Sequence, residues 1–229
     1  MEAADLGVRL CQRAASSVYC SYAIVALPVV VLALASFEIA GWLPTVLLWC
    51  SKPWLDRTIL FVLSRAAFGK RTSPADVWRE QRQVWWKHLL FTWTVRRFSL
   101  CRALTQPVYQ LEELSIWKTG ARVRQIRHRH AASAMMVTSA FSLSEAGLTV
   151  ALLSLLFWLA PAGLTPDLDA LLSGEIPIAL ALSIPIAYAM ALLFLEPFYV
   201  AAGFAMYLNR RAELEAWDIE QEFRRAFAL

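Results

Sequence analysis

The sequence predicts an all-α fold, a polytopic helical membrane protein with about four spans and additional amphipathic helices at the interface. Two observations predict it. Hydrophobic residues make up 59% of the 229 residues, whereas about 45 to 50% is usual for a soluble domain. The charged residues are also segregated from long apolar runs, and the run 176–195 contains no charge. At about 1.5 Å of rise per residue, twenty helical residues match the roughly 30 Å of a bilayer's hydrocarbon core.

The first segment, 1–70, is expected to contain an interfacial helix and a first membrane hairpin. The stretch 6–22 has the amphipathic pattern of a helix at the membrane surface. The run 22–50 carries only Glu38 as a charge, and as one straight helix it would exceed a single crossing. The Gly, Trp and Pro that follow Glu38 predict a turn at a membrane face. The two arms of the hairpin then cover about 21–37 and 43–63.

The second arm of this hairpin contains Lys52, Pro53, Asp56 and Arg57. Each charge near the bilayer centre costs about 2.5 to 3.5 kcal/mol on insertion scales. Two arrangements avoid that cost. Either the helix breaks at Pro53 and Asp56 pairs with Arg57 at the cytoplasmic edge, or the charges face other helices of the bundle. We expect the first arrangement.

The second segment, 71–134, is basic, rich in Trp, and has no run long enough to span. Pro74 begins a helical pattern of apolar residues that ends near Trp93. We expect this helix in the headgroup layer, with its indoles in lipid and its cations toward anionic headgroups. The alternative is a cytoplasmic helix packed on the protein itself. Another helix is expected over 109–132. The candidate lipid or partner contacts in this segment are Trp78, Trp85, Trp86 and Trp93.

The third segment, 135–208, predicts a second membrane hairpin with spans at 135–160 and 176–208. The loop 161–175 between them contains acids but no Lys or Arg. Of the 22 cationic residues, 16 lie between Lys52 and Arg129. By the positive-inside rule the middle of the chain and both termini then face the cytoplasm, with four crossings. Three crossings with an outward N-terminus are the alternative.

Three polar residues within the apolar runs are candidates for function, namely Glu145, Glu196 and Lys52. Acids at membrane depth are the usual relay groups for protons or cations. The alternative is a protonated carboxyl that hydrogen-bonds a neighbouring helix. The segments 52–54 and 196–198 are each a charge, a Pro and an aromatic residue, which raises the hypothesis of a duplicated unit with Lys52 facing Glu196.

The sequence predicts no catalytic, cofactor or metal site, and no enzyme activity. The four cysteines form no C-x-x-C pair, so neither a disulfide framework nor a zinc site is indicated. His128 and His130 alternate with Arg127 and Arg129, whose charges would repel a divalent ion, and His88 is remote in sequence. Phosphate-binding loops and nucleophile elbows are absent. Topology and lipid headgroups explain the basic residues without a nucleic acid.

The last segment, 209–229, predicts a cytoplasmic amphipathic helix. Arg210 with Glu213 and Arg211 with Glu215 stand at the i,i+3 and i,i+4 spacings of helical ion pairs. The candidate partner contacts here are Arg210, Arg211, Glu215 and Asp218.

Tyr207, Asn209 and Arg210, followed by Glu-Ala-Trp-Asp-Ile-Glu at 215–220, resemble the ending of uncharacterised bacterial polytopic inner-membrane proteins. Those proteins are related to the membrane domain attached to some glycerophosphodiester phosphodiesterases. The segments 52–69 and 96–112 are similar to a proteobacterial subset often encoded beside MoxR-type AAA+ ATPases. The resemblance implies a multi-pass protein of the bacterial inner (cytoplasmic) membrane. The hydrolase itself is absent, so the resemblance does not imply phosphodiesterase activity.

We therefore expect a non-catalytic inner-membrane anchor or accessory subunit without a cofactor. Its partners would be the phospholipid bilayer and a cytoplasmic ATPase or envelope protein. A small transporter or channel that uses Glu145 and Glu196 is the alternative, and a membrane enzyme ranks third.

Overall fold

The computed structural model describes residues 2–81, 84–85, 99–112, 116–159 and 178–227. Within these residues every regular element is helical, so the predicted all-α fold is confirmed. The elements, in chain order, are α1 (Glu2–Arg13), α2 (Ala15–Ala35), the 3₁₀ turn η1 (Ser36–Glu38), α3 (Leu43–Ala66), α4 (Pro74–Arg79), α6 (Arg102–Leu111), α7 (Ile116–Arg127), α8 (Ala131–Leu159) and α10 (Ile178–Phe227).

Three helices are long and apolar enough to cross a bilayer. Their apolar stretches are Ala15–Glu38 around α2, Ala131–Leu155 in α8 and Ile178–Ala216 in α10. The chain is therefore a membrane protein, as the sequence predicts. The expected loop 161–175 lies outside the described residues. α3 is longer than α2 but is not one of these three helices, and it contains four charged residues, Lys52, Asp56, Arg57 and Arg65.

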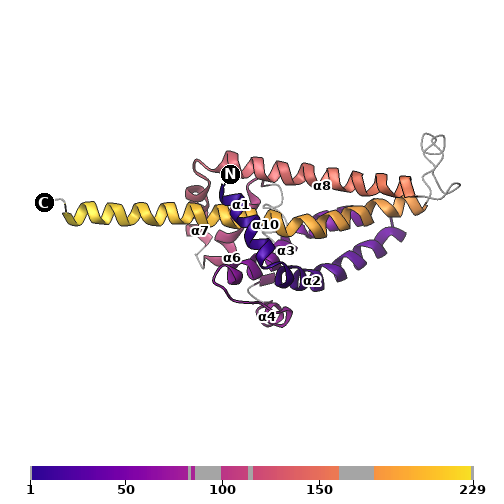
Figure 1. Ribbon diagram of the computed structural model, residues 1–229, viewed down its shortest axis with the longest axis horizontal. Coiled ribbons are helices and arrows are strands. Elements are labelled where there is room, and N and C mark those ends of the chain that lie inside the picture. The colour runs from indigo at the N-terminus through magenta and orange to yellow at the C-terminus, as the bar shows by residue number, and fades with distance from the viewer. Residues whose placement is uncertain (1, 82–83, 86–98, 113–115, 160–177, 228–229) are drawn as a thin grey trace.

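The helices form an elongated bundle around α10 (Figure 1). α8 runs along one side of α10, α3 packs against another side, and α2 packs on α3. At the end that holds the N-terminus, α1 lies on α10 and α6 packs beside it. Beyond these contacts α10 continues alone to the C-terminus (Figure 1). The predicted last span and the predicted C-terminal helix are thus one helix of 50 residues.

The first hairpin forms where the sequence predicts it, with η1 at the turn between α2 and α3. Val30 and Ala33 of α2 pack against Leu48 of α3. The single helix expected over 6–22 is wrong, because a turn at Ala14 separates α1 from α2. α1 lies on α10 rather than only on the membrane surface.

α1 can lie close to α10 because Gly7 has no side chain. A Cβ added at Gly7 would lie 2.9 Å from the Cα of Ala202 and would overlap the carbonyl of Ala201. Backbone atoms of a helix cannot move aside as a flexible side chain can, so only glycine fits this crossing.

α3 is one continuous helix, and Pro53 lies inside it. The expected break at Pro53 is therefore wrong, and the alternative, in which the charges face other helices, is correct. Every residue from 55 to 63 is buried. This half of α3 packs against α2, α6 and α10, so protein rather than lipid surrounds its charges and provides their partners.

The ion pair expected between Asp56 and Arg57 does not form. Consecutive residues of a helix point in different directions and do not face each other. The Arg57 Nη1 donates to the carbonyl oxygen of Trp85 at 3.4 Å, and Gln110 donates to the carbonyl oxygen of Arg57 at 2.8 Å. Asp56 points toward Arg102 instead.

The described part of the Trp-rich segment supports the protein-packed alternative. Trp85 is buried, its indole N–H donates to the Thr58 hydroxyl at 3.0 Å, and its ring centroid lies 5.5 Å from that of Trp54. The expected insertion of Trp85 into lipid is therefore wrong, whereas Trp78 is exposed. Trp86 and Trp93 lie outside the described residues.

α4 ends at Arg79, and a turn at Glu80 interrupts the helix expected from Pro74 to Trp93. Residues 86–93 of that expected helix lie outside the described residues. Ser73 and Asp76 form a reciprocal capping box at the start of α4. Hydrogen bonds from the backbone N–H and then the hydroxyl of Ser73 hold the pKa of Asp76 below its usual range. A carboxylate at the first turn also interacts favourably with the helix dipole.

The helix expected over 109–132 is interrupted. α6 ends at Leu111, α7 begins at Ile116, and Arg129 adopts a left-handed conformation with φ of 66° before α8. The interruption lets α6 turn back onto α10, where Gly203 lies against Ala103. This contact brings Arg102 to the bundle.

Candidate functional site

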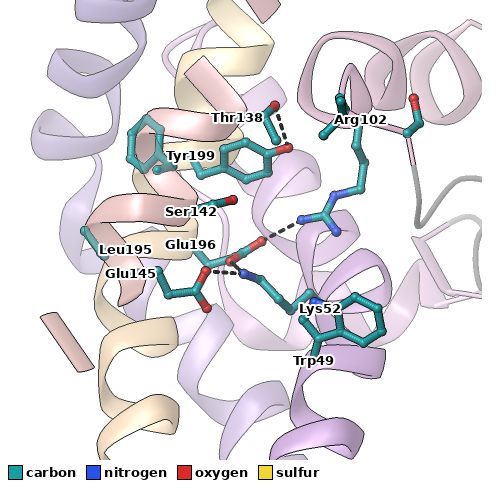
Figure 2. A pocket seen from close by; sticks show the side chains of 12 residues that line it. Trp49, Lys52, Arg102, Thr138, Ser142, Glu145, Leu195, Glu196 and Tyr199 are labelled. Atoms are coloured by element: carbon teal, nitrogen blue, oxygen red, sulfur yellow. Dashed lines mark hydrogen bonds and ion pairs between the residues drawn. The ribbon is translucent and has the colours of Figure 1, made fainter. Parts of the chain in front are cut away.

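Lys52 of α3 lies between two carboxylates from two other helices (Figure 2). Its Nζ is 2.6 Å from Oε2 of Glu145 on α8 and 3.0 Å from Oε2 of Glu196 on α10. Lys52 and Asp56 are four residues apart on α3, which places them on one face of that helix. The hypothesis that Lys52 faces Glu196 agrees with this geometry, and a duplicated unit stays a prediction.

Arg102 of α6 joins the same group from the other side (Figure 2). Its Nε is 3.1 Å from Oδ2 of Asp56, and its Nη2 donates to Oε1 of Glu196 at 3.0 Å. Its guanidinium carbon lies 5.3 Å from the ring centroid of Tyr199, within the range of a cation–π contact. We call Lys52, Asp56, Arg102, Glu145 and Glu196 the charge cluster.

The charge cluster is buried and carries three carboxylates against two cations. Asp56 is 1% exposed and Glu196 is 3% exposed. A buried ion pair adds little net stability, because desolvation offsets the attraction, but removal of one partner leaves an expensive unpaired charge. The stability of each charged side chain in the cluster therefore depends on the presence of its partners. The second oxygen of Glu145, Oε1, accepts no hydrogen bond from any described residue.

One face of α8 is polar where it meets the charge cluster. Thr138, Phe141, Ser142 and Glu145 stand at i, i+3, i+4 and i+7, which aligns them along one side of the helix. The Thr138 and Tyr199 hydroxyls are 3.3 Å apart, and the Phe141 ring meets the Tyr199 ring edge to face at 5.7 Å between centroids. This side of α8 therefore packs against α10.

A cavity of about 280 Å³ lies beside the charge cluster. α3, α8 and α10 supply most of its wall, and α6 with the residues before it supplies the remainder. Its polar lining includes both cations, Glu145 and Glu196, together with the Ser142 hydroxyl. Its apolar lining includes Phe141 together with Trp49 and Leu195, which are labelled in Figure 2. The arrangement can bind a small charged group.

The structure brings together all three polar candidates of the sequence, Lys52, Glu145 and Glu196. It adds two charges that the sequence did not assign to this site, Asp56 and Arg102. The i,i+4 spacing of Lys52 and Asp56 could have revealed the first addition. No local pattern reveals the second, because Arg102 reaches Glu196 only through the packing of α6 on α10.

The C-terminal candidates lie far from this cavity. Arg210 pairs with Glu213 at 2.9 Å and Arg211 pairs with Glu215 at 2.5 Å, so both predicted ion pairs are confirmed. Asp218 belongs to the described backbone of α10, but its side chain lies outside the described residues.

The cysteines and histidines add no further site to the described part of the chain. All four cysteines are free, and Cys11 and Cys101 are buried. Among the described residues, no group of three His, Cys, Asp or Glu side chains is placed to hold a metal ion. His130 instead lies 3.3 Å from a carboxylate oxygen of Glu213.

Comparisons of this chain with protein-family models, with curated proteins and with solved structures find no match. The family resemblance of the sequence therefore stays a prediction, and the proposals below depend on the geometry.

Proposed function

We propose that the protein is a non-catalytic anchor or accessory subunit that holds a partner at the cytoplasmic face of a bacterial inner membrane. The observation that carries this proposal is the extension of α10. This helix leaves the bundle and continues as a single straight helix (Figure 1). From 215 to 227 it would extend about 20 Å at 1.5 Å of rise per residue. The bundle still contacts α10 as far as Glu213 and Leu214, and the part beyond Leu214 is well suited to dock another protein.

The projecting part of α10 is prepared as a helix before any partner binds. Isolated helices of this length are marginal because their nucleation is unfavourable. Here the span already provides the nucleus, and the extension only propagates it. The Arg210–Glu213 and Arg211–Glu215 pairs add about 0.2 to 0.5 kcal/mol each. A preformed helix loses little conformational entropy on binding.

The nature of the partner follows from the family resemblance, which implies a soluble ATPase or an envelope protein. The surface near the membrane that we assign to the same partner includes Trp78, which is 65% exposed. Large exposed aromatic side chains are frequent anchors at protein interfaces.

The proposed topology has both termini in the cytoplasm and α3 as a fourth crossing. The distribution of Lys and Arg supports this orientation. The burial of the charged half of α3 removes the objection that its charges would face lipid. Glu38 and Lys70 then lie on opposite sides of the membrane, since they flank the two ends of α3.

We expect a membrane-impermeant maleimide to label Glu38→Cys in intact spheroplasts and to label Lys70→Cys only after permeabilisation. Both positions are exposed, and the four native cysteines would first be replaced by alanine. The alternative with three crossings and an outward N-terminus places Glu38 inside. Absence of Glu38→Cys labelling in intact spheroplasts would contradict the proposed orientation, and labelling of Lys70→Cys there would contradict it as well.

A chain that ends at Ala216 is expected to stay in the membrane but to lose its partner. This truncation keeps the whole apolar stretch of α10 and both ion pairs, so the fold should be unaffected. Affinity purification in mild detergent, followed by quantitative mass spectrometry, should recover one soluble protein at near-stoichiometric yield with the full chain and at least tenfold less with the truncated one. Glu38→Gln, at the opposite end of the bundle, is the matched control. Equal recovery with the truncated chain would exclude the docking role of α10.

A second candidate function, a small transporter of cations, is favoured by the cavity beside the charge cluster. Its four charged lining residues belong to four different helices, so a relative motion of these helices would change the site. Transport first requires a ligand for this cavity.

A further inference from the structure

The charge cluster beside the cavity has a formal excess of one carboxylate, because Asp56 belongs to the cluster, while the cavity itself is lined by two cations and two carboxylates. Lys52 and Arg102 are shared among Asp56, Glu145 and Glu196, so one formal negative charge stays uncompensated. Arg57 does not compensate it, because its guanidinium lies against the Trp85 carbonyl. A buried unbalanced charge is unfavourable in a low dielectric, so a positively charged ligand would be stabilised here.

Asp56 and Glu145 both have carboxylate oxygens without a hydrogen-bond partner among the described residues, and of these two side chains only Glu145 lines the cavity. Its side chain is 12% exposed, and its Oε2 accepts a hydrogen bond from Lys52. The Tyr188 hydroxyl of α10 is a further neighbour of Glu145, but no described donor lies within hydrogen-bond distance of Oε1. Glu196, in contrast, is bound by both cations. An unpaired buried carboxylate oxygen on the wall of a cavity is a site for a donor.

The size and walls of the cavity favour an organic cation over a metal ion. Its volume of about 280 Å³ is several times the roughly 30 Å³ share of one water molecule. Trp49 and Phe141 line it, and aromatic faces attract cations that carry alkyl groups. A bare metal ion would need several more oxygen ligands than Glu145 and the nearby hydroxyls offer.

The polar lining favours an ammonium with N–H groups over a fully methylated one. Besides Glu145, the hydroxyl oxygens of Thr138 and Ser142 on the same face of α8 can accept hydrogen bonds. A trimethylammonium group has no N–H to donate. A primary ammonium would satisfy the carboxylate and the hydroxyls together.

Part of the cavity lining is apolar and exposed. Two of its lining residues, Trp49 and Leu100, are 45% and 51% exposed, and Trp49 belongs to a helix of the membrane bundle. A lipid headgroup could enter from the bilayer, and a small solute could enter from water.

We propose that this cavity binds a primary ammonium group and that Glu145 is the carboxylate that receives it. Two sources carry this chemistry, the headgroup of phosphatidylethanolamine and a soluble primary amine. The inference does not depend on the accessory role, and for the transport candidate it names the class of ligand. Its failure would show in ligand binding, whereas failure of the accessory role would show in partner recovery.

The test uses the purified full-length protein in two arms. In the first, native mass spectrometry compares the retained phosphatidylethanolamine and phosphatidylcholine after release from vesicles that contain equal amounts of each. In the second, calorimetry compares ethylammonium and tetramethylammonium binding to the protein in nanodiscs of phosphatidylcholine alone. At least a tenfold preference for phosphatidylethanolamine over phosphatidylcholine in the first arm identifies the lipid as the source of the ammonium group. At least a tenfold preference for ethylammonium over tetramethylammonium in the second arm identifies a soluble amine. No preference in either arm overturns the proposal.

Glu145→Gln should reduce the preference about tenfold, because it removes the charge and keeps the shape. Glu213→Gln, which removes a carboxylate outside the cavity, should leave it unchanged. If Glu145→Gln fails to fold, Ser142→Trp provides an independent variant, because Ser142 is exposed at the cavity and a larger side chain there would fill it without touching the ion pairs. A preference that survives the folded variants overturns the assignment to this cavity.

Discussion

Lys52→Met is expected to destabilise the protein by about 3 to 5 kcal/mol, the usual result of removing one partner from a buried ion pair. Methionine is one heavy atom shorter than lysine and keeps most of its unbranched side chain, so packing changes little. Glu145 and Glu196 would both lose the ammonium that lies within 3.0 Å of each, and Arg102 alone would face three carboxylates. Equilibrium unfolding in mixed detergent, monitored by tryptophan fluorescence, measures the change. Lys70→Met, at an exposed position, is the control and should change stability by less than about 0.5 kcal/mol.

A second substitution separates charge balance from pairwise contact. Lys52→Met combined with Glu145→Gln restores the original excess of one negative charge and should recover at least half of the lost stability. The reversal of Lys52→Glu with Glu196→Lys should not recover it, because Glu196 also binds Arg102 and the reversal would place two cations together. If the neutral double variant is no more stable than Lys52→Met alone, the cluster is not balanced as a unit.

The sequence predicted the features that depend on local pattern. The turn at Glu38 follows from a Gly, a Trp and a Pro beside an acid, and both ion pairs of the C-terminal helix follow from i,i+3 and i,i+4 spacing. Such patterns contain their own partners within one or two helical turns. They hold in the structure because no tertiary contact is needed to satisfy them.

The sequence failed where the surroundings of a residue decide its conformation. Pro53 and its charged neighbours predict a broken helix if lipid surrounds them, but a continuous α3 is favourable once α6 and α10 cover it. Trp85 is buried for the same reason, since Thr58 accepts the hydrogen bond of its indole. Hydropathy measures the free energy of transferring a residue from water into lipid. It does not measure the free energy of transferring that residue into a protein interior that supplies polar partners.

The error in pairing Asp56 with Arg57 was avoidable, whereas the contact of Asp56 with Arg102 was not. Adjacent helical residues diverge in direction, so the first pair was geometrically unfavourable. The second pair joins α3 to α6 across 46 positions of the chain and exists only because α6 packs on α10. Of the five charges in the cluster, local pattern could therefore identify four.

The charge cluster and the projecting helix are mechanically connected through α10. Glu196 is held by α3 through Lys52 and by α6 through Arg102, and Pro197 follows it directly. Proline weakens the helical hydrogen bonds of the preceding turn, and the Tyr19 hydroxyl donates to the carbonyl oxygen of Phe194 in that turn at 2.8 Å. The ion pairs thus hold α10 beside the turn that Pro197 weakens.

Gly203→Val is expected to cost about 3 kcal/mol, the upper end of the usual penalty for overpacking. A Cβ added at Gly203 would lie 2.6 Å from the carbonyl oxygen of Ala103 and would overlap the Ala103 Cβ. Because these atoms belong to a helix backbone and its first side-chain carbon, no rotamer change can relieve the overlap. α6 would have to move away from α10, and Arg102, the residue before Ala103, would withdraw from Glu196. The same detergent unfolding measurement detects the loss, and ammonium binding should weaken with it.

Gly147→Val is the matched control for this prediction. Gly147 also lies within a long apolar helix, α8, but a Cβ added there would meet nothing within 4 Å. Valine has the higher helix propensity of the two residues by a few tenths of a kcal/mol, so this variant should be neutral or slightly more stable. The difference between the two glycines depends only on the approach of α6 to α10. Equal stability of Gly203→Val and Gly147→Val would therefore show that α6 does not lie against α10, and Arg102 would then lose its place in the charge cluster.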